Sequence, residues 1–337
     1  MYSNNIKTFN HIPLSILDLA HINEGGTARE SFRNSVDLAK HADKWGFNRY
    51  WFAEHHNMPG VASSATSVII GHIASHTNDI RVGSGGVMLP NHATLVIAEQ
   101  FGTLEALFPG RIDLGLGRAP GTDQRTAFAL RRNLNESVED FPMQVNELQD
   151  YFSDEPKTHV KAIPGKGAHV PLWLLGSSGF SAQLAAHKGL PFSFASHFAP
   201  DYLNDALALY RERFEPSEAL AKPHAMPAVN IIAADTQEKA EYLATSQQQM
   251  FLSLRRNQPS KFQPPRNMDD VWTATEQVAV GKTLDSPATI IGDPESVKRQ
   301  LEDFIDQTNA DEIMIASAIY DHKERLRSFE ILSEMMD

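Results

Sequence analysis

Cysteine is absent from the 337 residues of the chain. This absence excludes a disulfide framework, a thiolate metal site and a cysteine nucleophile. Basic residues are scarce, with 30 Lys and Arg against 42 Asp and Glu, so the formal net charge is −12. Because an acidic chain repels phosphate backbones and anionic lipid, we expect neither a nucleic-acid partner nor a membrane partner.

Long apolar runs are also missing. No stretch approaches the ~18 uncharged apolar residues that a membrane-spanning helix needs, and the first ten residues are polar. We therefore expect a soluble, cytoplasmic protein. A (β/α)8 barrel commonly fills ~250 residues or more, so the length fits a single domain over residues 1–337.

Short apolar segments alternate with helical patterns along the whole chain. The predicted strands are residues 12–20, 49–54, 80–89, 111–117, 171–175, 191–195, 228–233 and 312–316. The predicted helices are residues 31–45, 65–76, 95–107, 138–152, 181–188, 202–214 and 295–306, with a polar helix that ends near residue 256. Eight alternating units favour an α/β fold of the (β/α)8, or TIM-barrel, type.

Two segments are longer than a plain strand–helix unit requires, residues 118–170 and residues 236–290. The second contains a proline-broken stretch, residues 257–266. Insertions at the C-terminal face of a barrel usually carry substrate recognition. We therefore expect residues 236–290 to form a mobile insertion that covers the site.

Two histidines follow the second predicted strand. His55 and His56 come directly after Glu54, at the carboxyl end of the strand, which is the functional mouth of a parallel barrel. Because successive strand residues point to opposite sides, at most one of the two imidazoles faces the barrel lumen. The alternative is a pair of loop histidines bound to backbone carbonyls. No carboxylate cluster completes a set of metal ligands with the histidines, so we predict no metal site.

Glycine thins the third predicted strand at Gly83, Gly85 and Gly86. Because glycine weakens a strand interior, this pattern indicates either the close approach of a flat ligand or a bulge in the barrel. Arg118 follows the fourth strand and brings a permanent cation to the mouth. Either an anionic ligand or a buried partner would neutralise this cation.

The fifth predicted strand leads through glycine and hydroxyl residues into an apolar helix. Exposed N–H groups at a helix N-terminus, together with Gly176, Ser177 and Ser178, make a phosphate cradle. The alternative is that Ser178 or Ser181 merely caps the helix. Taken together, a cation, a phosphate cradle, a glycine-thinned strand and a histidine pair at strand ends describe a site for a flat, phosphorylated cofactor.

The same motifs resemble the bacterial luciferase-like flavin monooxygenase family, and in particular its uncharacterised luciferase-like monooxygenase group of enterobacterial type. The motifs are FAEHH at residues 52–56, VGSGGVMLP at 82–90, AEQ at 98–100, PGRIDLGLGR at 109–118, LLGSS at 174–178 and IGDPESV at 291–297. The resemblance therefore covers nearly the whole chain. It departs from the light-emitting subunits after Arg118 and in the proline-rich loop, so light emission is not implied.

The resemblance implies a TIM barrel that binds FMN at its C-terminal mouth. Such an enzyme takes reduced FMN, delivered by a separate NAD(P)H-dependent flavin reductase, and uses O2 to oxidise a small organic substrate. The resemblance also implies a homodimer. It does not identify the substrate.

The residues that the resemblance assigns form two groups. His55 matches the catalytic histidine of the family, and His56 is the catalytic candidate next to it. Gly85 and Gly86 fall where the family carries a non-proline cis peptide beneath the flavin ring. The cofactor-binding candidates are Gly85, Gly86, Arg118, Gly176, Ser177, Ser178 and Ser181.

Three alternatives remain open. An F420-dependent reductase of the same barrel family would transfer hydride without oxygen, but its anionic cofactor calls for a more basic mouth than the net charge of −12 encourages. A non-catalytic FMN-binding or carrier protein would bind oxidised FMN tightly and consume no oxygen. A metal-dependent barrel hydrolase, reasoned without the family, would contain zinc or manganese.

Overall fold

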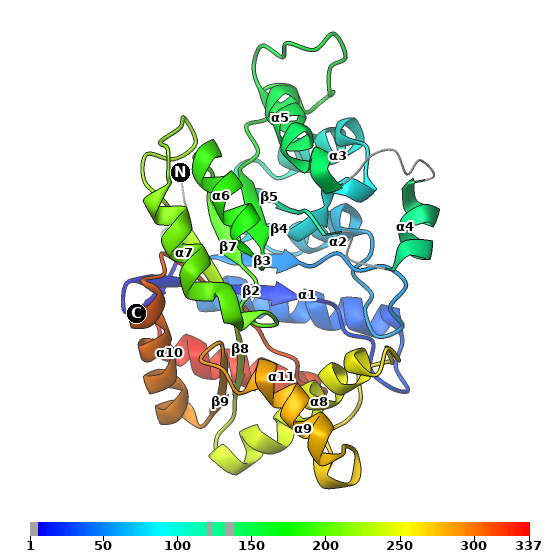
Figure 1. Ribbon diagram of the computed structural model, residues 1–337, viewed down its shortest axis with the longest axis vertical. Helices are drawn as coiled ribbons and strands as arrows, with labels where there is room; N and C mark the ends of the chain where they lie inside the picture. Colours follow the sequence, from blue (N-terminus) through cyan, green and yellow to red (C-terminus); the bar gives the residue numbers. More distant parts are fainter. Residues whose placement is uncertain (1–5, 120–122, 132–137) are drawn as a thin grey trace.

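The computed structural model describes residues 6–119, 123–131 and 138–337. At its centre, parallel strands form a closed barrel that is surrounded by helices (Figure 1). Around the ring, the strands follow the order β2, β3, β4, β5, β6, β7, β8 and β10, and β10 pairs with β2 to close it. This arrangement confirms the predicted (β/α)8 barrel.

The barrel strands begin and end close to the predicted limits, and two further short strands lie outside the ring. In chain order the strands are β1 (Thr8–Phe9), β2 (Ile12–Asp18), β3 (Arg49–Phe52), β4 (Arg81–Met88), β5 (Ile112–Gly117), β6 (Leu172–Gly176), β7 (Phe192–Phe194), β8 (Ala225–Ala233), β9 (Thr289–Gly292) and β10 (Ile313–Ala316).

The helices pack around the outside of the barrel and at its mouth (Figure 1). They are α1 (Ala28–Trp45), α2 (Thr66–Ala74), α3 (Thr94–Leu107), α4 (Gln124–Arg131), α5 (Phe141–Phe152), α6 (Gly179–Lys188), α7 (Leu203–Glu212), α8 (Gln237–Arg255), α9 (Ala274–Leu284), α10 (Pro294–Thr308) and α11 (His322–Glu334). Short 3₁₀ helices are η1 (Leu89–Asn91), η2 (Val138–Asp140), η3 (Pro200–Tyr202) and η4 (Met268–Asp270).

Local chemistry sets the ends of several helices. Thr27 and Glu30 form a capping box at the start of α1, and Gly46 ends this helix with a φ of 89°. Asp293 caps α10 through the backbone N–H of Ser296. The sequence analysis did not predict β1, β9, α4, α9 or α11.

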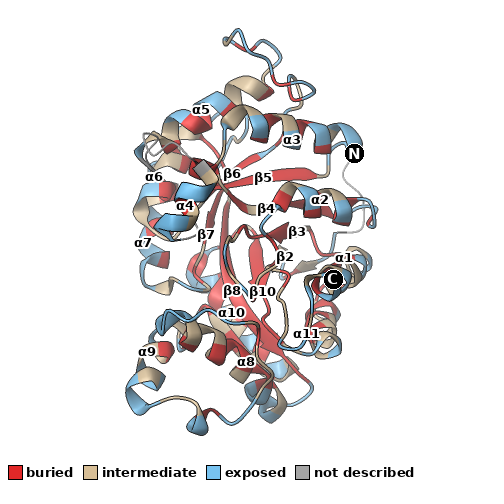
Figure 2. Ribbon diagram, turned by 90° about the vertical axis from the view of Figure 1, so that its right-hand side faces the viewer, coloured by how far each residue is buried: buried red, intermediate tan, exposed pale blue. Residues whose placement is uncertain are grey.

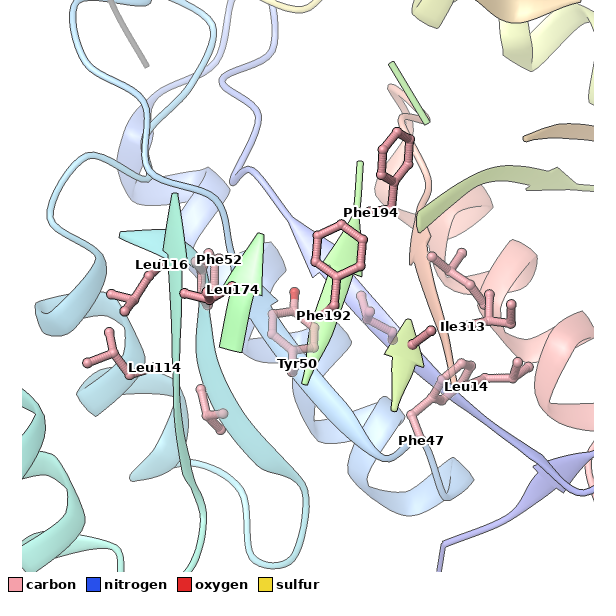
Figure 3. Close-up of a cluster of buried hydrophobic side chains, with 14 of the residues drawn as sticks. Leu14, Phe47, Tyr50, Phe52, Leu114, Leu116, Leu174, Phe192, Phe194 and Ile313 are labelled. Carbon is pink, nitrogen blue, oxygen red and sulfur yellow. The ribbon is translucent and has the colours of Figure 1, made fainter. Parts of the chain in front are cut away.

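The side chains of the barrel strands alternate between two environments. Those that point outward pack against the helices and form the main apolar core, which Figure 3 shows around Tyr50, Leu114 and Phe192. Accordingly, the strands are buried along their length, whereas the outer helix faces are exposed (Figure 2). Those that point inward form a smaller cluster that includes Trp51 and Met314.

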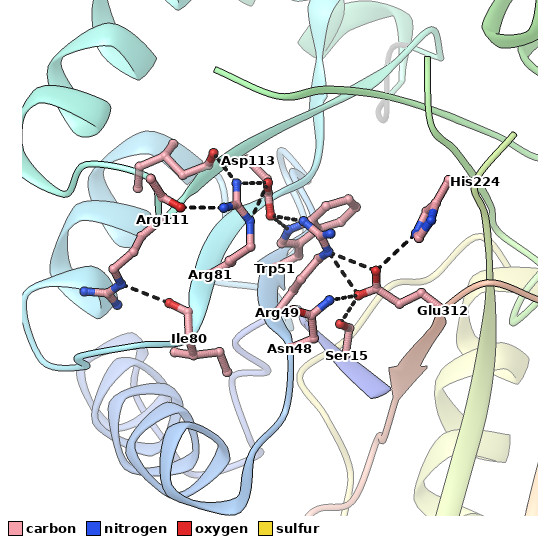
Figure 4. A network of polar contacts seen from close by, with 12 residues as sticks. Ser15, Asn48, Arg49, Trp51, Ile80, Arg81, Arg111, Asp113, His224 and Glu312 are labelled. Atoms are coloured by element: carbon pink, nitrogen blue, oxygen red, sulfur yellow. Dashed lines mark hydrogen bonds and ion pairs between the residues drawn. The ribbon is translucent and has the colours of Figure 1, made fainter. Parts of the chain in front are cut away.

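A network of buried ion pairs fills the N-terminal end of the barrel interior (Figure 4). Arg49 bridges two carboxylates, with its NH1 2.7 Å from Asp113 Oδ2 and its Nε 2.9 Å from Glu312 Oε1. The Nε of Arg81 donates to Asp113 Oδ1 at 3.0 Å, and Asn48 Nδ2 donates to Glu312 Oε1 at 2.9 Å. We call these five residues the floor network.

The two cations of the floor network hold its carboxylates in the charged form. Burial alone raises the pKa of Asp113, but Arg49 and Arg81 outweigh burial and leave the pKa below its ordinary value. The pKa of Glu312 is lowered to about 2, because Arg49 and several hydrogen bonds exceed the effect of burial. The floor network therefore has its charges compensated within itself.

Among the described residues, no helix is both long and apolar enough to cross a membrane. This finding agrees with the absence of a long apolar run in the sequence. Residues 1–5, part of the polar start of the chain, lie outside the described residues.

Candidate active site at the barrel mouth

A cavity of about 720 Å³ opens at the C-terminal ends of the barrel strands. This volume lies within the usual range of small-molecule sites, which is roughly 300–1,000 Å³. Trp51, Ala228 and Met314 of the inward-pointing apolar cluster line it as well. The predicted site residues that line the cavity are His55, Gly85, Gly86, Arg118, Gly176, Ser177, Ser178 and Ser181.

One end of the cavity is built for an anion. Strands β5 and β6 pair side by side with Gly117 opposite Leu175, so Arg118 and Ser177, which follow them, come from neighbouring strand ends. The Arg118 guanidinium lies 4.0 Å from the ring centre of Phe180 in the first turn of α6. The permanent cation is therefore held beside the N-terminus of this helix. Within the described residues, no carboxylate pairs with Arg118.

The Ser178 hydroxyl does not cap α6. Ser178 occupies the N-cap position of α6, but its side chain makes no capping hydrogen bond. The alternative that Ser178 merely caps the helix is therefore not supported. The first backbone N–H groups of α6 and the positive end of its dipole are available to a phosphate.

Backbone atoms form the wall of the cavity at the glycine-thinned strand. The Gly85–Gly86 peptide bond is cis, and the pairing of β4 with β5 shifts register between Ser84 and Val87. A Cβ at Gly86 would lie 2.7 Å from the carbonyl oxygen of Gly115. The strand therefore has the bulge considered in the sequence analysis, and both glycines also line the cavity.

The two consecutive histidines separate as the alternation of strand residues predicts. His55 is half-buried and lines the cavity, and its backbone N–H donates to the carbonyl of Ser63 at 3.3 Å. His56 is not among the residues that line the cavity, and its Nε2 lies 2.7 Å from Glu54 Oε1. Of these two histidines, only His55 is placed to meet a ligand in the cavity.

The insertion after α8 covers part of the mouth. Phe262 forms a parallel bridge with Asn23, in which the Phe262 N–H donates to the carbonyl of Ile22 at 2.9 Å. Its ring stacks on His21 with 4.7 Å between ring centres. The segment is therefore attached to the loop after β2, and its mobility stays a prediction.

Comparisons with known proteins identify the family of this site. The family described as luciferase-like monooxygenase matches residues 12–312. The chain belongs to the luciferase-like monooxygenase family. Proteins of this family are flavin-dependent oxidoreductases, so the chain is an enzyme of that class.

Relatives of this luciferase-like monooxygenase match over nearly their whole length. The chain is 60% identical to the protein YvbT of Bacillus subtilis (strain 168), over 96% of each chain. It is 55% identical to a luciferase-like monooxygenase of Escherichia coli (strain K12), over 97% of each. The crystal structure of apo-MsnO8 aligns with a TM-score of 0.85 and 32% identity, over 96% of this chain and 98% of that one.

The cavity of this family member fits a phosphorylated flavin. Arg118 and the uncapped start of α6 suit the phosphate. The apolar walls and the close backbone at Gly85 and Gly86 suit a flat ring. These features bring the cofactor-binding candidates of the sequence analysis together in one site.

Sequence reasoning missed two further histidines of the cavity. His21 follows β2 and His197 follows β7, and both line the cavity. Burial lowers the pKa of His21 to about 4, with Arg325 adding to the effect, and burial lowers the pKa of His197 to about 4. Both imidazoles are therefore neutral at pH 7. Their positions at strand ends, the same signal that pointed to His55, could have found them.

Sequence reasoning also missed a group behind the cavity wall. Oε1 of the buried Glu54 lies 2.7 Å from His56 Nε2 and 2.8 Å from His92 Nε2, and such a group could hold a metal ion. Burial raises the pKa of Glu54, but hydrogen bonds from both histidines outweigh it and leave the pKa lowered. The sequence analysis predicted that no carboxylate completes a set of metal ligands, and it did not foresee this group. Both distances are those of hydrogen bonds.

Proposed function

We propose that this chain is the oxygenase component of a two-component system, which takes reduced FMN and O2 and oxidises a small organic substrate. One observation carries the proposal: a single cavity joins a phosphate cradle at Arg118 to a half-buried histidine, His55. A separate NAD(P)H-dependent flavin reductase would supply the reduced FMN.

Different residues would bind the phosphate and the ring of FMN. Arg118, Ser177 and Ser178 would hold the phosphate by charge and hydrogen bonds. Gly85 and Gly86 would let the flavin ring approach the backbone of β4. Trp51, beneath the mouth, belongs to the apolar cluster that closes the cavity toward the floor and excludes water.

Bound reduced flavin would supply two electrons, so that one oxygen atom of O2 enters the substrate and the other leaves as water. The His55 imidazole would orient the reacting groups or carry a proton at one of its ring nitrogens. The insertion around Phe262 would keep bulk water out during this step.

One relative supports a monooxygenase, and one structure of the same fold supports FMN as its cofactor. An N-acetyl-S-alkylcysteine monooxygenase of Bacillus subtilis (strain 168) is 34% identical over 96% of this chain. The oxygenating constituent of 3,6-diketocamphane monooxygenase from Pseudomonas putida, in complex with FMN, shares the fold with a TM-score of 0.72 and 17% identity.

An F420-dependent reductase is the second candidate function. Two cations besides Arg118, Arg255 and Lys261, line the outer part of the cavity, so its basic character is greater than the net charge predicted. A longer anionic cofactor could meet them. However, Lys261 Nζ already donates to the carbonyl of Gly26 at 2.9 Å, and Arg255 NH2 donates to Thr283 Oγ1 at 3.2 Å.

We also propose that the protein is a cytoplasmic homodimer. Val68 on α2 and Val96 on α3 are 71% and 46% exposed, each lies in the first turn of its helix, and these two helices contact each other on the side of the barrel. Exposed apolar side chains that gather on one face are typical of a subunit interface. Light scattering of the purified protein would give twice the chain mass, whereas a single-chain mass would contradict the dimer.

The proposed function is tested by titrating the purified protein with FMN and F420, each oxidised and then anaerobically reduced. We expect tighter binding of reduced than of oxidised FMN, weak binding of F420, and oxygen consumption that depends on added substrate. Tight binding of oxidised FMN without substrate-dependent oxygen consumption would identify a carrier. Preference for F420 would identify a reductase.

A further inference from the structure

The charged residues of the cavity all have one sign. They are Arg118, Arg255, Lys261 and Arg325, and no Asp or Glu is found among the described residues that line the cavity. The chain as a whole has a net charge of −12, so a cavity whose charged residues are all cations stands out from it and favours the binding of anions. Arg118 is assigned to the phosphate of the cofactor, and a second anion would meet one of the others.

Arg325 is the cation placed deepest on the far side of the mouth. It lies on α11, is 8% exposed, and contacts the chain just beyond β10 because its Nε donates to the carbonyl of Ser317 at 3.1 Å. Strand β10 lies opposite β5 in the ring of eight strands, so Arg325 faces Arg118 across the mouth.

Asp18 compensates Arg325 from the side away from the cavity. It accepts from Arg325 NH2 at 2.9 Å and from Ser35 Oγ at 2.6 Å, and it does not line the cavity. His21, which does line the cavity, has its pKa lowered by burial and then by Arg325, and the opposing effect of Asp18 is smaller. At His21, the effect of Arg325 therefore exceeds that of its partner Asp18.

Two buried polar atoms of residues that line the cavity lack hydrogen-bond partners. Ser317 is 4% exposed and Gln247, on α8, is 1% exposed, yet neither Ser317 Oγ nor Gln247 Oε1 makes a hydrogen bond within the described structure. Gln247 lies one helical turn beyond Leu243, which packs with Ile319 just after β10. Both residues line the cavity.

A buried polar atom without a partner destabilises the fold, because it has lost its hydrogen bonds to water and gained none in return. A ligand that offers complementary groups would recover this cost. We propose that the substrate is a small organic carboxylate, whose acid group lies against Arg325 and Ser317 and whose neighbouring N–H or O–H donates to Gln247. The oxidised end of the substrate then points toward His55 and the flavin. This inference rests on the proposed monooxygenase function and specifies its substrate class.

The test compares carboxylates with their methyl esters. Arylalkanoates and N-acylglycines of graded size, each with its ester, are titrated calorimetrically into the protein loaded with FMN. We expect at least one acid to bind ten times more tightly than its ester. Equal affinity within every pair, or no binding by any compound, would overturn the proposal.

Variants locate the acid group. Ser317→Ala and Gln247→Leu both leave the Arg325–Asp18 pair intact. Ser317→Ala is expected to reduce the preference for the acid at least threefold. Gln247→Leu removes the acceptor for the N–H that an N-acylglycine shares with its ester, so it is expected to weaken the binding of both at least threefold. Arg325→Lys keeps the charge but loses the planar fork, and should reduce the preference for the acid further than Ser317→Ala if the variant folds. Ser193→Ala is the matched control, because its hydroxyl lines the cavity but already donates to the carbonyl of Met226 at 2.8 Å. A preference that survives Ser317→Ala contradicts the placement of the acid group, and N-acylglycine affinities that Gln247→Leu leaves unchanged contradict the placement of the N–H.

Arg118→Gln distinguishes this site from the phosphate cradle. We expect the variant to keep the preference for the acid, and a loss of the preference would place the acid at Arg118 instead. The titration is repeated on the protein without FMN. A wild-type protein that fails to bind FMN but still prefers acids would refute the proposed function and leave the carboxylate site standing.

Discussion

At the floor of the barrel, Arg49 and Arg81 face Asp113 and Glu312, whereas the cavity at the mouth is lined by four cations and, among the described residues, by no carboxylate. Both regions are built on the same strands, only a few residues apart. The floor compensates its charges internally. At the mouth Arg325 pairs with Asp18, which does not line the cavity, whereas Arg118 has no carboxylate partner among the described residues. This contrast separates residues that hold the barrel together from residues that we propose to bind ligands.

The apolar cluster between the two regions makes the separation possible. Trp51 and Trp173 meet edge to face at 5.2 Å between ring centres, above the floor network. The Arg49 guanidinium lies 4.7 Å from the ring centre of Trp173. Because the opposite charges of the floor network lie within hydrogen-bond distance of one another, their fields largely cancel before they cross this apolar layer to the cavity.

The largest effect is expected at the floor. Asp113→Asn removes the carboxylate that faces Arg49 and Arg81 and leaves two buried cations with too little compensation, so the free energy of unfolding should fall by about 3–5 kcal/mol. Urea unfolding followed by fluorescence measures the loss. Asp306→Asn, at an exposed position of α10, is the control. A variant as stable as the wild type would show that the floor network contributes little.

His55→Ala should act on rate and spare stability. Removing a general acid or base lowers turnover by about a hundredfold or more, while the unfolding midpoint and FMN affinity should stay near those of the wild type. Turnover is measured as product formed from the acid that binds best. His56→Ala is the matched variant, since His56 contacts Glu54 behind the cavity wall. Equal losses of turnover in both variants would contradict the difference between the two histidines.

The smallest of the three effects is expected at the phosphate cradle. Arg118→Gln removes one charge-assisted contact and should weaken FMN binding by about thirtyfold, which corresponds to about 2 kcal/mol. Riboflavin lacks the phosphate, so its affinity should not change. Fluorescence titration of both flavins makes the comparison, and a parallel loss for both would refute the contact.

The sequence was sufficient to predict the barrel and to choose candidates that, except for His56, line the cavity, while the roles of these candidates stay predictions. Apolar segments such as residues 191–195 are short, but each is bounded by turn signals, and eight of them alternate with helical patterns. Glycines and hydroxyls at strand ends, such as Gly86 and Ser177, carry a local signal because the fold brings strand ends to one face. The same rule places His55 at the mouth.

The remaining features depend on contacts between distant residues. Arg49 meets Asp113, 64 positions away, and Glu312, 263 positions away, and no local pattern marks these pairs. The four residues of the short strand β9 were too few to be recognised as a strand. This strand lies outside the ring and pairs with the C-terminal half of β8. Arg325 was missed because α11, which carries it, was not predicted.

The closure of the barrel has a consequence for how the protein is made. Strand β10, the last of the ring in the chain, pairs with β2, the first. During synthesis from the N-terminus, this pairing must wait until about 300 residues have been added. The Arg325 side of the proposed carboxylate site depends on that final strand and the helix after it, since Ser317 follows β10 and Arg325 lies on α11. A nascent chain that still lacks these elements therefore has no complete site, and substrate cannot assist the folding steps that precede their synthesis.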